Sequence, residues 1–290
     1  AHTFPQFGID VRFADYRKPD TFSSLIDENT KAVYCESIGN PLGNVTDIGR
    51  LAEVAHSHGL PLIVDNTVAT PYLCRPIEHG ADIVVHSLTK YIGGHGTSIG
   101  GAIVDSGKFP WNEHKSRFKR LNEPDVSYHG VVYTEALGPA AYIGRARVVP
   151  LRNTGAAISP FNAFQIIQGL ETLPLRMDRI CENSLKIAKF LKGHAKVAWV
   201  NYSALPDHEN NDILQKYMSG RASGILNFGL KNGRSSGESF QDALKLFTRL
   251  VNIGDCKSLA CHPASTTHRQ LASEELDLAG VTEDMVRLSI

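Results

Sequence analysis

The segment ADIVVHSLTKYIGGHG (81–96) carries the residues best suited to chemistry. A buried strand is expected to end at Ser87, and Thr89, Lys90 and a glycine-rich loop follow it. Beside apolar walls and hydroxyls, a lysine loses its proton more readily and can attack an aldehyde. The two hydroxyls can donate to a phosphate, and the glycines let the backbone approach a bulky cofactor. The motif alone leaves open the alternative of a surface lysine before a flexible loop.

Two further polar residues follow predicted strands. Asp65 lies in the apolar run LPLIVDN (60–66), about one parallel strand–helix–strand unit before Lys90. An aspartate there can pair with a protonated pyridine nitrogen, and Asn40 in ESIGNP can hydrogen-bond a phenolic oxygen. Because parallel sheets bind ligands at the carboxyl ends of their strands, we expect these side chains to converge with Ser87. A role for Asp65 in capping the next helix or binding loop amides, and a simple turn at Asn40, remain alternatives.

A candidate carboxylate site lies near the end of the sequence. Arg287 falls in the apolar strand pattern DMVRLSI (284–290), where an unpaired guanidinium would be costly. Its planar fork of donors suits an α-carboxylate, and Ser258 can supply a further donor. A structural salt bridge to a nearby acid is the alternative, and Arg287 taken alone favours it.

Two rival catalytic motifs lack the surroundings they need. GTSIG (96–100) matches the G-x-S-x-G nucleophile elbow, but a glycine loop precedes the serine and a strand pattern follows it. SLTK (87–90) matches the S-x-x-K motif of penicillin-recognising enzymes, whose Ser-Asp-Asn and Lys-Thr-Gly motifs do not occur in the sequence. Both hydrolase hypotheses are therefore disfavoured.

The elements that position these residues predict an α/β fold. Short apolar strands alternate with helices in the first half, which indicates a mainly parallel sheet covered on both faces. The expected elements there are strands at 31–37, 60–66, 81–87 and 100–106 and a helix at 47–59. The second half has expected helices at 159–170, 175–192 and 242–250 and strands at 196–202, 224–230 and 284–290. Fewer strands there predict a smaller α+β domain, and Pro174 predicts the boundary between domains 1–174 and 175–290.

The composition excludes several classes of protein. The 290 residues are 42% hydrophobic and 21% charged, which is enough for a sizeable core. Thirty Lys+Arg balance thirty Asp+Glu, and no apolar run is long enough to span a bilayer, so neither nucleic acid nor membrane is expected as a partner. Five cysteines without a Cys-x-x-Cys motif fit a reducing cytosol. The twelve histidines form no ligand motif, so no metal is expected.

Six ordered segments, spread over essentially the whole chain, resemble the Cys/Met-metabolism family of pyridoxal-phosphate enzymes. They are ESIGNP, VDNTVATPYLCRP, HSLTKYIGGHG, SPFNAFQIIQGLETLPLRM, KSLACHPASTTH and VRLS. The resemblance implies the aspartate aminotransferase-like fold type I, with a large domain that binds pyridoxal 5′-phosphate and a smaller C-terminal domain. It also implies the following roles: Lys90 as the catalytic Schiff-base lysine, Asp65 at the pyridinium nitrogen, Ser87 and Thr89 at the phosphate, Asn40 at the ring oxygen, and Ser258 and Arg287 at the substrate carboxylate.

Within this family, residues 105–138 and 144–164 resemble the O-acetylhomoserine sulfhydrylase branch. That branch replaces the acetate of O-acetyl-L-homoserine with sulfide and gives L-homocysteine, in methionine and cysteine biosynthesis. Methionine γ-lyase and cystathionine γ-synthase activities stay open, as does a catalytically silent assembly subunit. The nucleophile (sulfide, methanethiol or cysteine) and the acyl leaving group (acetyl or succinyl) also stay open, because pocket shape selects them. The resemblance implies a cytoplasmic homotetramer built from dimers that share active sites.

The family carries a region before the position of Ala1 and a helical end after that of Ile290. The preceding region supplies phosphate-binding amides, an aromatic ring stacked on the cofactor and a Tyr/Arg pair that reaches the neighbouring subunit. We therefore expect these 290 residues to be part of such an enzyme, with both ends of the family fold missing. Alone, they should bind the cofactor weakly and not turn over.

Overall fold

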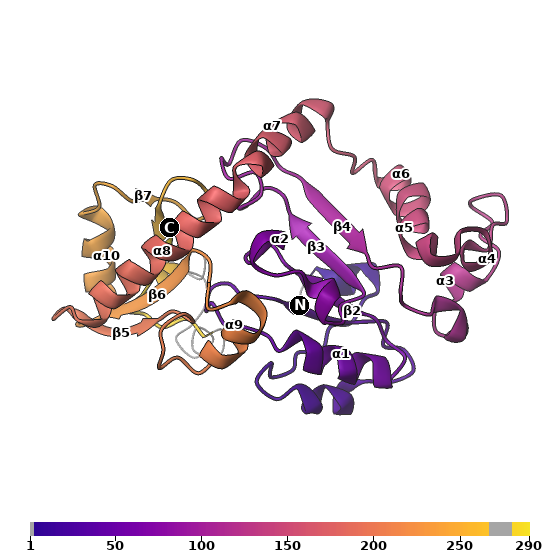
Figure 1. Ribbon diagram of the computed structural model, residues 1–290, viewed down its shortest axis with the longest axis horizontal. Helices are drawn as coiled ribbons and strands as arrows, with labels where there is room; N and C mark the ends of the chain where they lie inside the picture. Colours follow the sequence, from indigo (N-terminus) through magenta and orange to yellow (C-terminus); the bar gives the residue numbers. More distant parts are fainter. Residues whose placement is uncertain (1–2, 267–279) are drawn as a thin grey trace.

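The chain folds around two β-sheets (Figure 1). The computed structural model describes residues 3–266 and 280–290. The first sheet has the strand order β1-β2-β3-β4, and the second has the order β5-β6-β9-β8-β7. Buried apolar side chains form one core that includes residues of both sheets, such as Val64 on β2 and Phe228 on β6. The two sheets are therefore parts of one packed molecule.

The first sheet is built from the predicted strands. β1 (Val33–Glu36), β2 (Leu62–Asp65) and β3 (Ile83–Ser87) are parallel, whereas β4 (Gly101–Asp105) is antiparallel to β3. The sheet is thus mainly parallel, as predicted. The chain reverses after β3 through the loop 88–100, in which the N–H of Gly93 donates to the carbonyl of Leu88 at 2.9 Å. No helix crosses over between β3 and β4, and parallel pairing would need such a crossover.

Different elements cover the two faces of this sheet. On one face, Leu62 and Val64 join the main core together with α1 (Ile48–Ser57). On the other face, Ile83 packs in a second cluster with Phe109 and Trp111. This alternation is the period-two pattern of a strand buried on both faces. The remaining helices of this half are α2 (Thr70–Leu73), α3 (Lys119–Asn122), α4 (Tyr133–Leu137), α5 (Ala141–Ala146) and α6 (Arg152–Thr154).

The second sheet lies at the left of the molecule in Figure 1, and the first sheet lies nearer its middle. Its strands are β5 (Val197–Asn201), β6 (Ile225–Leu230), β7 (Thr248–Arg249), β8 (Leu259–Cys261) and β9 (Met285–Ser289). All pairs are antiparallel except β7 with β8. Its helices are α8 (Leu173–Lys192), α9 (Asn211–Met218) and α10 (Arg234–Asp242). The prediction of fewer strands in this half is wrong, because this sheet has five strands and the first has four.

The helix predicted over residues 242–250 is also wrong. Only its first residue belongs to a helix, and Thr248–Arg249 instead form an edge strand that pairs with β8. Leu244 and Phe247 still pack against the core, but from irregular chain at the sheet edge. The helix that precedes them, α10, approaches its neighbours closely: a Cβ on Gly237 would lie 2.5 Å from the ring of His262. Tertiary packing has overridden the local helical pattern.

Pro174 lies at the start of a helix. α7 (Pro160–Glu171) ends at Glu171, and Pro174 lies in the first turn of α8, where its missing N–H costs nothing. α8 then runs along the second sheet (Figure 1). One helix thus ends and the next begins near the predicted position. A domain boundary at residue 174 remains a proposal.

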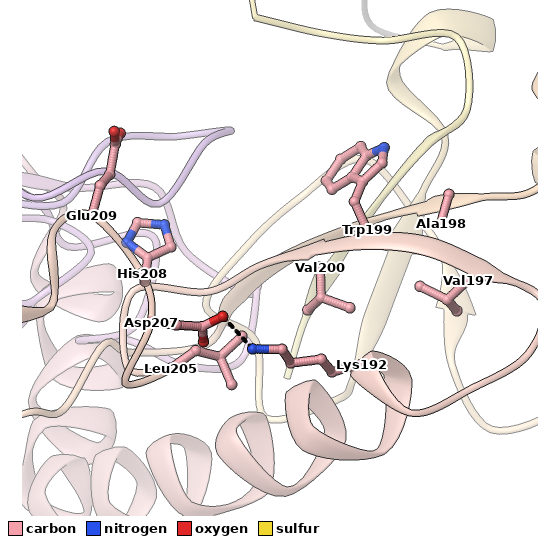
Figure 2. Close-up of a pocket in the computed structure, with 9 residues that line it drawn as sticks. All are labelled: Lys192, Val197, Ala198, Trp199, Val200, Leu205, Asp207, His208 and Glu209. Carbon is pink, nitrogen blue, oxygen red and sulfur yellow. Dashed lines mark hydrogen bonds and ion pairs between the residues drawn. The ribbon is translucent and has the colours of Figure 1, made fainter.

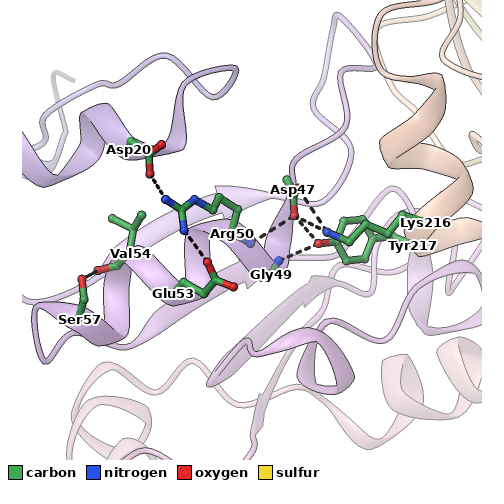
Figure 3. Close-up of polar contacts among 9 residues, drawn as sticks. All are labelled: Asp20, Asp47, Gly49, Arg50, Glu53, Val54, Ser57, Lys216 and Tyr217. Carbon is green, nitrogen blue, oxygen red and sulfur yellow. Dashed lines mark hydrogen bonds and ion pairs between the residues drawn. The ribbon is translucent and has the colours of Figure 1, made fainter.

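Polar contacts fix the first sheet's loops to the second half (Figure 3). Asp47 caps α1 by accepting a hydrogen bond from the N–H of Arg50, and it also accepts from Tyr217 and Lys216 on α9. The Tyr217 hydroxyl in turn accepts from the N–H of Gly49 at 2.9 Å. We call Asp47, Arg50, Lys216 and Tyr217 the Asp47 cluster. It joins the start of α1 to α9.

Candidate active site

Lys90 and Arg287 are brought together by a residue that the sequence did not single out, Asn252. The Nζ of Lys90 donates to Oδ1 of Asn252 at 2.5 Å. Arg287, on β9, donates to the backbone carbonyl of Asn252 at 3.2 Å and to Oδ1 of Asn40 at 3.0 Å. Three of the predicted site residues, Asn40, Lys90 and Arg287, thus meet Asn252 in one group. We call these four residues the Lys90 cluster.

The electrostatics of the Lys90 cluster favour a reactive amine. Burial lowers the pKa of Lys90, and the positive charge of Arg287 lowers it further. A larger neutral fraction makes an amine a better nucleophile. Arg287 is only 7% exposed, and among the described residues no carboxylate forms an ion pair with it. Its partners there are carbonyl oxygens, so the positive charge is available to a ligand.

The Asn40 segment is held in place from the second half of the chain. The side chain of Asn201 donates to the carbonyl of Leu42 at 2.7 Å, and Asn227 donates to that of Pro41 at 2.5 Å. The N–H of Val45 donates to Oδ1 of Asn210 at 3.2 Å. These bonds fix the loop that follows β1, which lets Asn40 reach Arg287.

Asp65 lies at the carboxyl end of β2, between two neighbouring strand ends. It pairs in register with Glu36 on β1 and with Val85 on β3, two residues before Ser87. Its carboxylate accepts hydrogen bonds from the N–H of Thr67 at 2.9 Å and from the hydroxyl of Tyr34 at 3.2 Å. The strand ends converge as predicted, and Asp65 also binds a loop amide, which was the simpler alternative.

The two hydroxyls proposed for a phosphate lie on either side of Leu88. The N–H of Ser87 donates to the hydroxyl of Thr67 at 2.8 Å. The hydroxyl of Thr89 accepts from the N–H of Gly100 at 3.1 Å and donates to its carbonyl at 3.3 Å. Thr89 thereby closes the loop between β3 and β4. Both side chains are half-buried.

The structure does not bring Ser258 to the Lys90 cluster. Cys261 on β8, rather than Ser258, lies opposite Arg287 on β9. Three residues of extended chain separate Ser258 from Cys261, about 10 Å, and strand alternation turns its side chain to the other face. Asn252 occupies the position beside Arg287. The sequence signal for it is weak: one polar residue in the apolar run LVNIG (250–254).

Two hollows lie away from Lys90. The first is lined by α8 and β5 residues with His208 and Glu209 (Figure 2). Its charged and polar groups already have partners: Lys192 pairs with Asp207, Nε2 of His208 lies 2.6 Å from Oδ1 of Asn201, and Glu209 accepts from the hydroxyl of Tyr16 at 3.3 Å. The second is a mostly apolar groove between the first sheet and α5, with Ser87 among its lining residues. Neither hollow combines the groups that meet at Lys90.

Metals and membrane spans are not indicated. The described residues 3–266 and 280–290 contain no group of three or more His, Cys, Asp or Glu side chains suited to a metal ion. No helix in that part of the chain is long and apolar enough to cross a membrane.

Known proteins resemble this chain over its full length. The family model for "Cys/Met metabolism PLP-dependent enzyme" matches residues 1–290. A homocysteine synthase of Schizosaccharomyces pombe is 50% identical over 289 residues, which cover 99% of this chain and 67% of that protein. An O-acetyl-L-homoserine sulfhydrylase of Leptospira meyeri is 50% identical over 298 residues, covering 100% of this chain and 67% of its own length. The chain thus spans about two thirds of these relatives.

A solved structure agrees with the fold. A Campylobacter jejuni protein described as an O-acetylhomoserine (thiol)-lyase, with a pyridoxyl-lysine phosphate residue, matches with a TM-score of 0.93 and 41% identity. The match covers 100% of this chain and 69% of that one. The predicted fold type I is confirmed by this likeness. Together with the family match, it shows that the chain belongs to the Cys/Met metabolism family of pyridoxal-phosphate-dependent enzymes.

Proposed function

We propose that this chain carries the lysine and the carboxylate-binding arginine of an enzyme that converts O-acetyl-L-homoserine and sulfide to L-homocysteine and acetate. Two relatives that are 50% identical to it are named for this reaction, as a homocysteine synthase and an O-acetyl-L-homoserine sulfhydrylase. The observation that carries the proposal is the Lys90 cluster. It sets an amine of lowered pKa beside a buried guanidinium that no described carboxylate neutralises.

The donors present fit pyridoxal 5′-phosphate. The amine of Lys90 suits its aldehyde, the carboxylate of Asp65 its ring nitrogen, and the amide of Asn40 its ring oxygen. Asn40 uses its oxygen to accept from Arg287, and its Nδ2 group is the donor that a ring oxygen requires. Ser87 and Thr89 supply hydroxyls for a phosphate. When bound, the cofactor withdraws electrons from the substrate and makes its C–H bonds more acidic.

Lys90 has two tasks in this proposal. Its amine would hold the cofactor covalently, through the aldehyde, before substrate binds. The freed amine then removes a proton at Cα of the substrate and moves protons at Cβ. A lowered pKa increases the fraction of the amine that is neutral and able to accept a proton.

Arg287 and Asp65 hold the ends of the system. Arg287 would bind the α-carboxylate of the substrate through two parallel N–H···O bonds, which fixes the Cα–H bond relative to Lys90. Asp65 would keep a proton on the ring nitrogen, and Tyr34 and Thr67 hold its carboxylate in one orientation.

We further propose that the enzyme is a cytoplasmic homotetramer, built from dimers that share active sites. The support for the assembly is the family resemblance. The support for a reducing compartment is that all five cysteines are free.

The function is tested by an assay that combines each possible homoserine ester with each possible sulfur nucleophile. The purified full-length protein is supplied with O-acetyl- or O-succinyl-L-homoserine, each with sulfide, methanethiol or cysteine. We expect homocysteine from the acetyl ester and sulfide as the fastest product. Cystathionine from cysteine would indicate a cystathionine γ-synthase, and breakdown of methionine without an acceptor would indicate a γ-lyase. No turnover despite bound cofactor would indicate a silent subunit.

A further inference from the structure

Cys256 and His95 form a pair of potentially reactive side chains outside the Lys90 cluster. Both are exposed, and Sγ of Cys256 lies 3.9 Å from Nε2 of His95. Nδ1 of His95 lies 2.6 Å from the carbonyl oxygen of Gly93. A carbonyl can only accept, so Nδ1 carries the proton and Nε2 of the neutral ring presents its lone pair to the thiol. An imidazole acceptor beside a thiol activates the sulfur as a nucleophile.

A fixed positive charge lies near this pair. The guanidinium of Arg176 donates to the backbone carbonyls of Tyr91 at 2.6 Å and Ile92 at 3.1 Å. It packs against Gly94, where a Cβ would lie 2.6 Å from Nη1, and its charge interacts with Cys256. A cation at this place stabilises negative charge that develops on the sulfur.

The other four cysteines lack these features. Cys74, Cys181 and Cys261 are buried, and Cys35 is half-buried. Loss of solvent raises the pKa of Cys35 and Cys74 to about 12 and that of Cys181 to about 11. These thiols are therefore poor nucleophiles and serve as an internal reference for Cys256.

Backbone contacts join the pair to the loop of Lys90. The N–H of Cys256 donates to the carbonyl of Gly94 at 2.7 Å. Gly254 packs so closely on this loop that a Cβ there would lie 2.5 Å from the backbone nitrogen of Tyr91. Asn252, two residues earlier, is the partner of Lys90. A group attached to Cys256 would therefore disturb the segment that positions the amine.

We propose that Cys256, with His95 as its base, is a site of thiol–disulfide exchange with small-molecule disulfides. The thiol proton moves to Nε2 of His95, and the sulfur attacks one sulfur of the disulfide. A new S–S bond forms as the S–S bond of the reagent breaks, and the departing thiolate takes the proton from His95. Cys256 is thereby oxidised to a mixed disulfide, and half of the reagent is reduced to a thiol.

The test uses oxidised glutathione as the probe on the purified holoenzyme, followed by intact mass and peptide mapping. We expect one glutathione per chain, on Cys256, that dithiothreitol removes. Cys256→Ser should take up none over the same time, and His95→Gln should react roughly tenfold more slowly. Cys181→Ser, which removes a buried thiol, should react at the wild-type rate.

Adducts on another cysteine, or none at all, would overturn the proposal, and an unchanged rate in His95→Gln would remove His95 from it. Turnover should fall as the wild-type adduct forms and stay constant in Cys256→Ser. Full turnover by the adduct would refute the coupling to Lys90. Only this last measurement rests on the proposed function, because the mass of the adduct needs no turnover.

Discussion

The Lys90 cluster and the Asp47 cluster use the same kinds of side chain in opposite ways. In the Asp47 cluster, Lys216 and Arg50 both have carboxylate partners. In the Lys90 cluster, Lys90 and Arg287 are held by amide oxygens. A carboxylate neutralises a cation, whereas an amide orients it and leaves its charge in place. The difference separates a site prepared for an anionic ligand from a contact that joins two parts of the fold.

The two aspartates sharpen this contrast because their partners are alike. Asp65 accepts from a tyrosine hydroxyl and a backbone N–H, and so does Asp47. Asp47 adds the ammonium of Lys216 and caps a helix, whereas Asp65 ends a parallel strand beside two others. These shared hydrogen bonds do not distinguish a cofactor-binding aspartate from a structural one. The position of each aspartate in the fold does.

The largest effect is expected for Lys90→Ala. It removes both the covalent anchor and the proton carrier, so kcat should fall by about 10³-fold or more. Lys216→Ala, in the Asp47 cluster, should leave steady-state turnover unchanged because an exposed ion pair contributes little. Equal losses of kcat in the two variants would show that the two clusters do not differ in function.

Asp65→Asn should act on rate with the cofactor still bound. Loss of the charge that keeps the ring nitrogen protonated should lower kcat on the order of 10²-fold. The cofactor absorbance measured alongside kcat separates this from poor binding. Asp47→Asn is the matched control and should retain wild-type kcat. If Asp65→Asn also retained the wild-type kcat, Asp65 would serve only as a hydrogen-bond acceptor for Thr67 and Tyr34.

Arg287→Lys should act on substrate binding. One ammonium cannot reproduce a two-point fork, and the loss of about 1.5–3 kcal/mol corresponds to roughly 10- to 100-fold in KM. Arg50→Lys removes a comparable fork at the surface of α1 and should leave KM unchanged. A normal KM in Arg287→Lys would favour a structural role for the arginine.

The smallest effect concerns the stability that Asp47 provides. Burial alone would raise the pKa of Asp47, but hydrogen bonds from Tyr217, Arg50 and Lys216 outweigh it and lower the pKa from its ordinary 3.8. A lowered pKa gives stability above pH 3.8 that is lost as the pH falls through the folded-state value. Asp47→Asn should therefore unfold more easily at pH 7, by less than about 1 kcal/mol. The gap should close below pH 3.8 in urea titrations. A gap independent of pH would show that the charge is not involved.

Much of the fold could be predicted because the first sheet depends on local patterns. The runs around Leu62 and Ile83 are apolar on both faces, the run around Val33 is apolar on one, and turns or helix caps separate them. The helix at residues 242–250 could not be predicted correctly, because Leu244 and Phe247 pack against the core from irregular chain and Thr248–Arg249 pair with β8. Periodicity over nine residues does not reveal which partner is available.

Site residues could be predicted from the sequence where they lie in a recognisable motif. They could not be predicted where the register between paired strands determines which residue lies near Arg287. Lys90, Asp65 and Asn40 follow strands, and the strands bring their ends together. Ser258 and Asn252 are six positions apart. The pairing of β8 with β9 sets Cys261, not Ser258, opposite Arg287, and the carbonyl of Asn252 accepts a hydrogen bond from Arg287. Such non-local pairing leaves no trace in the local sequence.

The proposed mechanism requires that Lys90 is the residue bonded to the cofactor. The most direct test is to reduce the purified full-length holoenzyme with borohydride, digest it and locate the pyridoxyl group by mass spectrometry. We expect one pyridoxyl phosphate per chain, on Lys90, in the peptide that begins the glycine loop. A pyridoxyl group on another lysine, or none after reduction of a protein that turns over, would contradict it.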